Sequence, residues 1–100
     1  MKKIHRIAII GVGAIARMHA RAIADLDRAE LVAGCCRTED KGRKFAAEYG
    51  CIWHGDFQEM LDVEKPGVVT IATPSGAHLA PVEACAQRGV HVHKHRLVPR

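Results

Sequence analysis

The residues with the clearest chemical meaning form the segment Gly11-Val12-Gly13-Ala14-Ile15-Ala16, which has the G-x-G-x-x-A spacing of a dinucleotide-binding turn. Gly11 allows a tight turn after a strand, and Gly13 lets a pyrophosphate approach the backbone without meeting a Cβ. The N–H groups of Ala14 and Ile15, at the positive end of the next helix, would face the phosphates. The spacing therefore predicts a dinucleotide site formed by Gly11, Gly13, Ala14 and Ile15.

The residues about 20 positions past the glycines bear on which dinucleotide binds. NAD-binding proteins usually place Asp or Glu there, to accept hydrogen bonds from the ribose 2′-hydroxyl. This sequence instead has Cys36, followed by Arg37 and Thr38, and no carboxylate occurs before Glu39. A cation and a hydroxyl suit a 2′-phosphate, which a carboxylate would repel. Arg37 and Thr38 therefore favour NADP over NAD, and a merely solvated Arg37 is the alternative.

A third candidate is the turn Thr73-Pro74-Ser75-Gly76-Ala77-His78, which follows the fourth predicted strand. In an open parallel sheet, ligands bind at the carboxyl ends of the strands, where the strand order reverses. This turn would border the same crevice as the glycine turn, and the Thr73 hydroxyl could reach the ribose or the nicotinamide. Ordinary turn chemistry explains the same residues equally well.

The remaining reactive residues do not form a catalytic or metal-binding set. The cysteines at positions 35, 36, 51 and 85 lack a C-x-x-C pair, so we expect buried, reduced thiols in a cytoplasmic protein. His91, His93 and His95 alternate along one stretch, which leaves a metal-binding edge as a minor alternative. We predict no catalytic residue and no metal ligand from the spacing of these side chains.

Composition limits the classes of protein to consider. The chain has 100 residues, 48% of them apolar and 26% charged, which suits one soluble domain with a packed core. No apolar run approaches the roughly 20 residues of a membrane-spanning helix. The net charge of +4 comes from basic ends around an acidic middle, and the few aromatic residues do not interleave with the basic ones. We therefore expect neither a nucleic-acid nor a membrane partner.

The apolar pattern alternates between strand and helix character. Strands are predicted at 4–10, 30–36, 51–53, 68–72 and 90–93, and helices at 14–24, 39–49, after Asp56, and from about 78 to 88. In the first helix, Ile15, His19 and Ile23 share one face, and Asp56 with Glu59 resembles a capping box. This order predicts an α/β fold, a three-layer, doubly wound parallel sheet (Rossmann) of about five strands, with residues 1–100 forming one dinucleotide-binding domain.

Longer motifs add a family resemblance over roughly residues 4–92. The segment Gly11–His19, the segment Phe45-Ala46-Ala47-Glu48-Tyr49-Gly50, Thr73-Pro74 with His78, and Gly89-Val90-His91-Val92 occur in the order seen in one family. The chain resembles the N-terminal NAD(P)-binding domain of the glucose–fructose oxidoreductase / inositol dehydrogenase (Gfo/Idh/MocA) family.

The resemblance implies an oxidoreductase that transfers a hydride between a nicotinamide cofactor and a sugar, cyclitol or related polyol. It places Gly11, Gly13, Ala14 and Ile15 along the pyrophosphate. It places Arg37 and Thr38 beside the adenosine ribose, and Thr73, Pro74 and His78 toward the nicotinamide. It also implies a C-terminal substrate domain, which these 100 residues do not include.

The sequence departs from the family after the fifth predicted strand. Family members carry Glu-Lys-Pro there, with a lysine that reaches the reacting hydroxyl or carbonyl, whereas this chain has His95-Arg96-Leu97. A two-residue deletion would align Lys94 instead. The ending Leu97-Val98-Pro99-Arg100 matches part of an engineered thrombin site. An engineered remnant, a truncation and a frameshift near residue 93 are the alternatives, so 93–100 is a candidate non-native or aberrant tail.

These departures shape the functional expectations. We expect the 100-residue chain to bind the cofactor weakly at best and to turn nothing over. The apolar surface that a substrate domain would cover favours self-association into a homo-oligomer or aggregate. The alternatives are a non-catalytic dinucleotide-binding or regulatory module and, third, a methyltransferase that uses a similar glycine turn.

Overall fold

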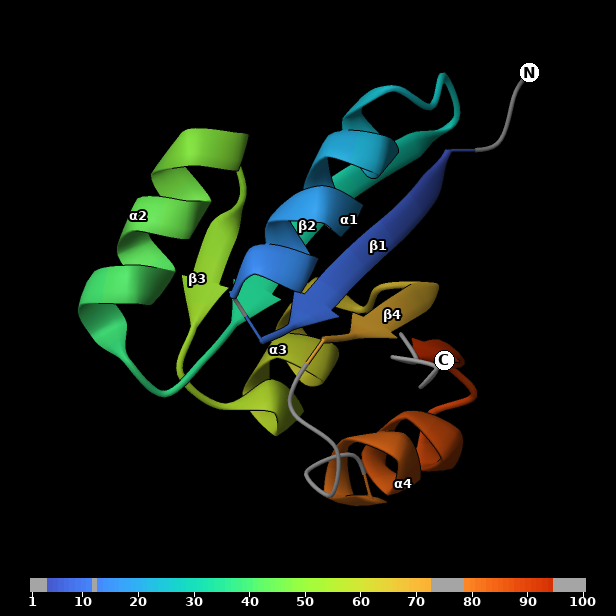
Figure 1. Ribbon diagram of the computed structural model, residues 1–100. Helices are drawn as coiled ribbons and strands as arrows, with labels where there is room; N and C mark the ends of the chain where they lie inside the picture. The colour runs from blue at the N-terminus through green and yellow to red at the C-terminus, as the bar shows by residue number, and fades with distance from the viewer. Residues whose placement is uncertain (1–3, 12, 73–78, 95–100) are drawn as a thin grey trace, which may run out of the picture.

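Five strands alternate with four helices along the part of the chain that the computed structural model describes, residues 4–11, 13–72 and 79–94 (Figure 1). The side chains at positions 14, 15, 79, 93 and 94 are outside the description. The strands are β1 (His5–Ile10), β2 (Ala29–Cys35), β3 (Ile52–His54), β4 (Val68–Ile71) and β5 (His91–Lys94). The helices are α1 (Ala14–Ala24), α2 (Glu39–Tyr49), α3 (Phe57–Glu64) and α4 (Leu79–Gln87). None of these helices is long and apolar enough to cross a bilayer.

The strands form one parallel sheet in the order β3-β2-β1-β4-β5. From β1 the chain moves outward through β2 to β3, and it then crosses to β4 and β5 on the other side. The order therefore reverses beside β1, and the turn that follows β1 lies at the switch point of the sheet.

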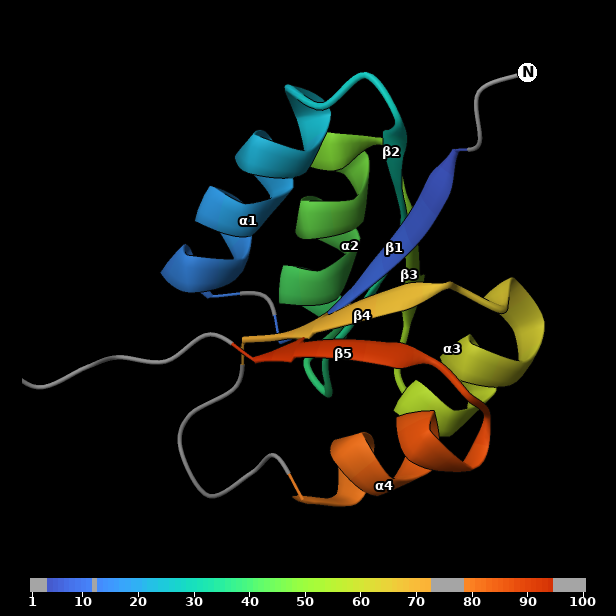
Figure 2. The same ribbon diagram turned by 90° about the vertical axis from the view of Figure 1, so that its right-hand side faces the viewer.

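Helices cover both faces of the sheet, as Figure 2 shows: α1 and α2 lie on one face, and α3 and α4 lie on the other. Successive side chains of β1 serve the two layers alternately. Ile9 packs with Ala16 and Phe45 beneath α1 and α2, whereas Ala8 and Ile10 pack with Met60 and other residues on the opposite face. Burial on both faces explains why β1 is continuously apolar from Ile7 to Ile10, whereas His5 and Arg6 at its start are exposed. The predicted three-layer, doubly wound fold is confirmed.

The predicted glycine stop of α2 is confirmed, whereas the predicted capping box of α3 is confirmed only at its first residue. Gly50 ends α2 in the left-handed region, with φ of 69°. The Asp56 side chain accepts a hydrogen bond from the Gln58 N–H at 3.0 Å and so caps α3. The predicted capping box is wrong at Glu59, because its carboxylate lies 3.6 Å from Nδ1 of His54 instead.

The buried stripe of α1 includes Ile23 of the predicted face, and its other members are two alanines. It is formed by Ala16, Ala20 and Ile23, whereas His19 is only half-buried. Small alanine side chains let the helix approach the sheet closely. The helix therefore turns this face toward the sheet rather than the face with His19. The strand boundaries differ by one residue: β2 ends at Cys35, β3 spans 52–54 and β5 spans 91–94.

Candidate functional site: the glycine turn and the ribose corner

The two glycines of the glycine turn, Gly11 and Gly13, are both described. Gly11 has φ of 101°, a conformation that other residues rarely adopt, and its N–H donates to the Cys35 carbonyl at 2.7 Å. Gly13 is exposed and forms the N-cap of α1 without a side-chain hydrogen bond. A Cβ at Gly13 would meet no described atom within 4 Å. The first turn of α1 also contains no acidic residue that would compensate the positive end of the helix.

The three candidate segments converge only in part within the described residues. Gly11 lies beside the end of β2 through its bond to Cys35, which brings the glycine turn next to Cys36. The Ala72 N–H donates to the Ile10 carbonyl at 2.8 Å, which places the chain just before Thr73 beside the same end of β1. Thr73, Pro74 and His78 themselves lie outside the described residues, as do Arg96 and the rest of 95–100.

Residues Cys36, Arg37 and Thr38, here called the ribose corner, join β2 to α2. Arg37 and Thr38 are exposed, and Thr38 is the N-cap of α2 but its hydroxyl does not cap the helix. Arg37 forms no ion pair with any described residue. The Glu39 carboxylate accepts from Nε of Arg43 at 2.5 Å. The corner therefore presents a cation and a hydroxyl, and its nearest acid in sequence is already paired.

The sequence reasoning missed Trp53, which lies beneath this corner. Its indole N–H donates to the Cys36 carbonyl at 3.1 Å, and a Cβ at Gly42 would lie only 2.0 Å from its Cδ1. The signal that could have revealed this contact is Gly42 itself, since glycine inside a helix costs about 0.5–1 kcal/mol relative to alanine and needs a reason.

The four cysteines are free, and they differ in burial. Cys35 and Cys85 are buried, whereas Cys36 and Cys51 are partly exposed, so the prediction of buried thiols is right for two of them. Burial, followed by the charges of Cys36 and Asp56, raises the pKa of the Cys35 thiol from 9.0 to about 12. Burial also raises the pKa of Cys51 and of Cys85. Within the described part of the chain, no three His, Cys, Asp or Glu side chains gather as metal ligands.

A buried polar pair lies on the α3 side of the sheet. Nε2 of His54 lies 2.9 Å from Oε2 of Glu64, and both side chains are largely buried. Arg6 of β1 lies 3.8 Å from the same carboxylate. The pair ties the end of β3 to the end of α3, and no step of dinucleotide binding requires it.

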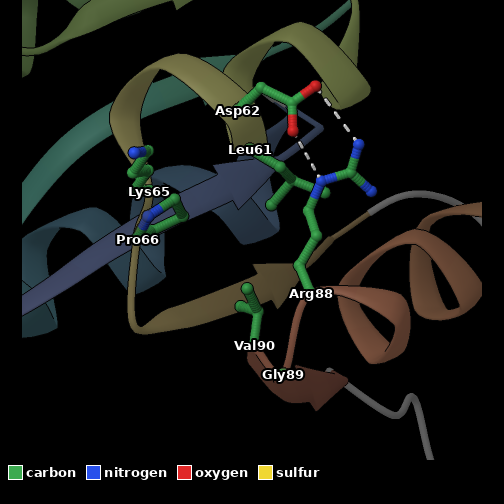
Figure 3. Close-up of a pocket in the computed structure, with 7 residues that line it drawn as sticks. All are labelled: Leu61, Asp62, Lys65, Pro66, Arg88, Gly89 and Val90. Carbon is green, nitrogen blue, oxygen red and sulfur yellow. Dashed lines mark hydrogen bonds and ion pairs between the residues drawn. The ribbon is translucent and has the colours of Figure 1, made fainter.

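A cavity of about 450 Å³ lies at the opposite end of the sheet from the glycine turn (Figure 3). It is lined by residues that precede β4 and β5, together with the Asp62–Arg88 pair between α3 and α4. Nε and Nη2 of Arg88 donate to the two Asp62 carboxylate oxygens at 2.8 and 3.3 Å. The hydrogen bond from Arg88 lowers the pKa of Asp62. Because ligands of such sheets bind at the carboxyl ends of the strands, this cavity is separate from the candidate site.

Comparison with known proteins places this geometry in a family. The family model for Gfo/Idh/MocA oxidoreductases, described as an oxidoreductase family with an NAD-binding Rossmann fold, matches residues 5–93. The chain is 37% identical over 84 residues to a D-apiose dehydrogenase of Paraburkholderia graminis, a match that covers 83% of this chain and 22% of that protein.

Two solved structures share the fold over nearly the whole chain. The WlbA dehydrogenase of Chromobacterium violaceum, in complex with NADH and UDP-GlcNAcA, gives a TM-score of 0.87 at 32% identity, over 94% of this chain and 27% of that one. A biliverdin reductase of Synechocystis sp. PCC 6803, in complex with biliverdin and NADP⁺, gives 0.84 at 29% identity, over 92% and 29%. The chain thus spans less than a third of the length of these relatives.

Proposed function

Because the chain belongs to the Gfo/Idh/MocA oxidoreductase family and carries its NAD-binding Rossmann fold, we propose that residues 1–100 form the dinucleotide-binding domain of a sugar, cyclitol or polyol dehydrogenase. The observation that carries the proposal is the open glycine turn at the switch point of the sheet. Gly11 takes the left-handed turn, Gly13 leaves space for the pyrophosphate, and the N–H groups of Ala14 and Ile15 bind it.

The ribose corner favours NADP over NAD. Arg37 supplies a cation without an ion pair among the described residues, the Thr38 hydroxyl does not cap α2, and Glu39 is held by Arg43. A 2′-phosphate gains a charge-assisted contact there, whereas the 2′-hydroxyl of NAD meets no carboxylate acceptor. Relatives of known structure have been found with NADH and with NADP⁺, so family membership alone does not decide between them.

Thr73, Pro74 and His78 border the nicotinamide side in this proposal. Support for their position comes from Ala72, whose N–H bonds to Ile10 at the end of β1. Bound nicotinamide would supply the hydride chemistry. The position after β5 that carries Glu-Lys-Pro in the family holds His95-Arg96-Leu97 here, and Arg96 cannot exchange protons as a lysine does. The triplet Glu64-Lys65-Pro66 does not replace it, because it precedes β4 at the other end of the sheet. We therefore expect the 100-residue chain to bind cofactor without turnover, since most of the polyol site belongs to a substrate domain and no Glu-Lys-Pro lysine follows β5 to exchange the proton.

The absence of Glu-Lys-Pro at the position after β5 also favours a second candidate, a non-catalytic module that binds a dinucleotide for regulation. The free thiols suit a reducing compartment, so the cytoplasm is the proposed location for either function. No nucleic-acid or membrane partner is proposed, and self-association as a homo-oligomer is tested by size-exclusion chromatography across protein concentrations.

Calorimetric titration of the purified chain with NADPH, NADH and S-adenosylmethionine tests the proposal. We expect binding of both dinucleotides, with NADPH tighter, and none of S-adenosylmethionine. Arg37→Ala should lower the affinity for NADPH about tenfold and change the affinity for NADH by less than about twofold. Arg28→Ala, at the other end of the sheet, is the matched control and should change neither affinity. Binding of S-adenosylmethionine alone would contradict the assignment, and turnover by the chain would contradict the expected inactivity.

A further inference from the structure

Trp53 lies next to two glycines, one on α2 and one in the turn after β3. A Cβ at Gly42 of α2 would lie 2.0 Å from Cδ1 of the indole and 2.2 Å from Nε1. Near the six-membered ring of the indole, a Cβ at Gly55 would lie 3.4 Å from Cζ2. Real Cβ atoms do not approach other atoms as closely as 2.0 Å, so α2 can pack on the indole only because position 42 lacks a side chain.

The indole N–H replaces a main-chain partner that β3 does not provide. The Cys36 N–H donates to the His54 carbonyl at 3.3 Å, which continues the β2–β3 ladder by one residue. β3 then ends, and Asp56 turns to cap α3, so it supplies no further rung. The Cys36 carbonyl accepts from Nε1 of Trp53 at 3.1 Å instead. The side chain therefore fixes the last peptide of β2 before Arg37.

The other flank of Arg37 is fixed from α2. Sγ of Cys36 donates to the Thr38 carbonyl at 3.1 Å, and the Gly42 N–H donates to the same carbonyl at 2.9 Å. Arg37 thus lies between two residues whose carbonyl groups both have hydrogen-bond partners. The residue that contacts Gly42 and Cys36 at once is Trp53.

The indole also contacts the arginine that binds Glu39, the carboxylate nearest in sequence to the ribose corner. The Arg43 guanidinium lies 5.4 Å from the centre of the Trp53 ring, in cation–π range, and Nε of Arg43 bonds to Glu39. Glu39 is the first carboxylate after the ribose corner. It is bound by Arg43, whose guanidinium lies over the Trp53 ring. A free Glu39 would instead compete with a phosphate for Arg37.

We infer that Trp53 is a positioning residue that sets the preference for a 2′-phosphorylated cofactor, because it fixes the peptide before Arg37 and supports the Arg43–Glu39 pair. This inference rests on the proposed function. Trp53 touches no part of the cofactor in this account and acts through Cys36 and Arg43.

Trp53→Phe tests the inference, since it keeps an aromatic ring and removes the N–H. We expect the ratio of the NADH to the NADPH dissociation constant to fall about fivefold to tenfold, with most of the loss on NADPH. Phe45→Leu is the control, because Phe45 is buried in the same α2 layer and contacts Tyr49 rather than the corner. It should lower the thermal midpoint and leave the ratio unchanged, as a purely structural change would.

The outcomes separate this inference from the proposed function. Equal weakening of both cofactors by Trp53→Phe, or no change in either, overturns the inference and leaves dinucleotide binding intact. A wild-type chain that binds the two cofactors equally also overturns it. A wild-type chain that binds no dinucleotide overturns the proposed function and the inference together.

A second measurement needs no variant, so it decides the question even if Trp53→Phe fails to fold. Trp53 is the only tryptophan, and its fluorescence therefore reports on this corner alone. Adenosine 2′,5′-bisphosphate should change the emission and its quenching by acrylamide, whereas adenosine 5′-monophosphate should change them far less. Calorimetric binding of the bisphosphate with unchanged Trp53 emission would overturn the inference.

Discussion

Gly42 and Trp53 are in direct contact between α2 and β3, and a Cβ at position 42 would overlap the indole. Gly42→Ala should therefore lower the free energy of unfolding by about 1–3 kcal/mol, although alanine is the better helix former. Urea denaturation followed by circular dichroism measures the change. Gly55→Ala approaches the same ring only at 3.4 Å and should cost less than about 1 kcal/mol. Equal effects of the two substitutions would contradict the contact.

Gly13→Ala should separate stability from binding. The methyl group meets no described atom within 4 Å, so the free energy of unfolding should change by less than about 1 kcal/mol. The same methyl group would occupy the proposed pyrophosphate path, so NADPH affinity should fall about tenfold or more. Gly67→Ala, which places a methyl group 3.9 Å from the Arg6 carbonyl at the other end of the sheet, should leave affinity unchanged. Unaltered NADPH binding by Gly13→Ala would remove the glycine turn from the site.

The two carboxylates that face His54 should differ in their contribution to stability. Glu64 is largely buried and 2.9 Å from Nε2, so Glu64→Ala leaves a buried imidazole nitrogen unpaired and should cost about 1–3 kcal/mol. Glu59 is exposed and 3.6 Å from Nδ1, so Glu59→Ala should cost less than about 1 kcal/mol. Chemical denaturation of both variants at one pH checks the order, and a reversed order would contradict it.

The buried thiol of Cys35 should make the folded protein less stable at alkaline pH. Its folded-state pKa is raised by burial from 9.0 to about 12, so its contribution to stability is fully present below pH 9. Above that pH the unfolded state loses the proton first, and stability falls as pH rises toward 12. The drop in the free energy of unfolding between neutral pH and about pH 11 should be smaller in Cys35→Ala. Met60→Ala, which removes a buried side chain without a titrating group, should keep the wild-type drop.

The glycine turn and the layered sheet were predictable because local rules specify them. The glycine spacing after a β-branched run specifies the turn. A glycine directly after a helical segment commonly ends the helix, as Gly50 ends α2. Periodicity alone did not indicate that Ala16 and Ala20 are buried while His19 is half-buried, because the separation of α1 from the sheet decides which face of the helix is covered. The Trp53–Cys36 and His54–Glu64 bonds join residues 17 and 10 positions apart, and no short-range pattern encodes such pairs.

The cavity beside Lys65 and Arg88 opens at the end of the sheet remote from the glycine turn. Lys65 is exposed there, so its amine is a convenient anchor for a surface or a dye. A chain immobilised through that amine would expose the opposite end of the sheet, where the glycine turn lies, to the solution. Pyridine nucleotides could then reach the proposed site freely, as a reagentless sensor for them requires.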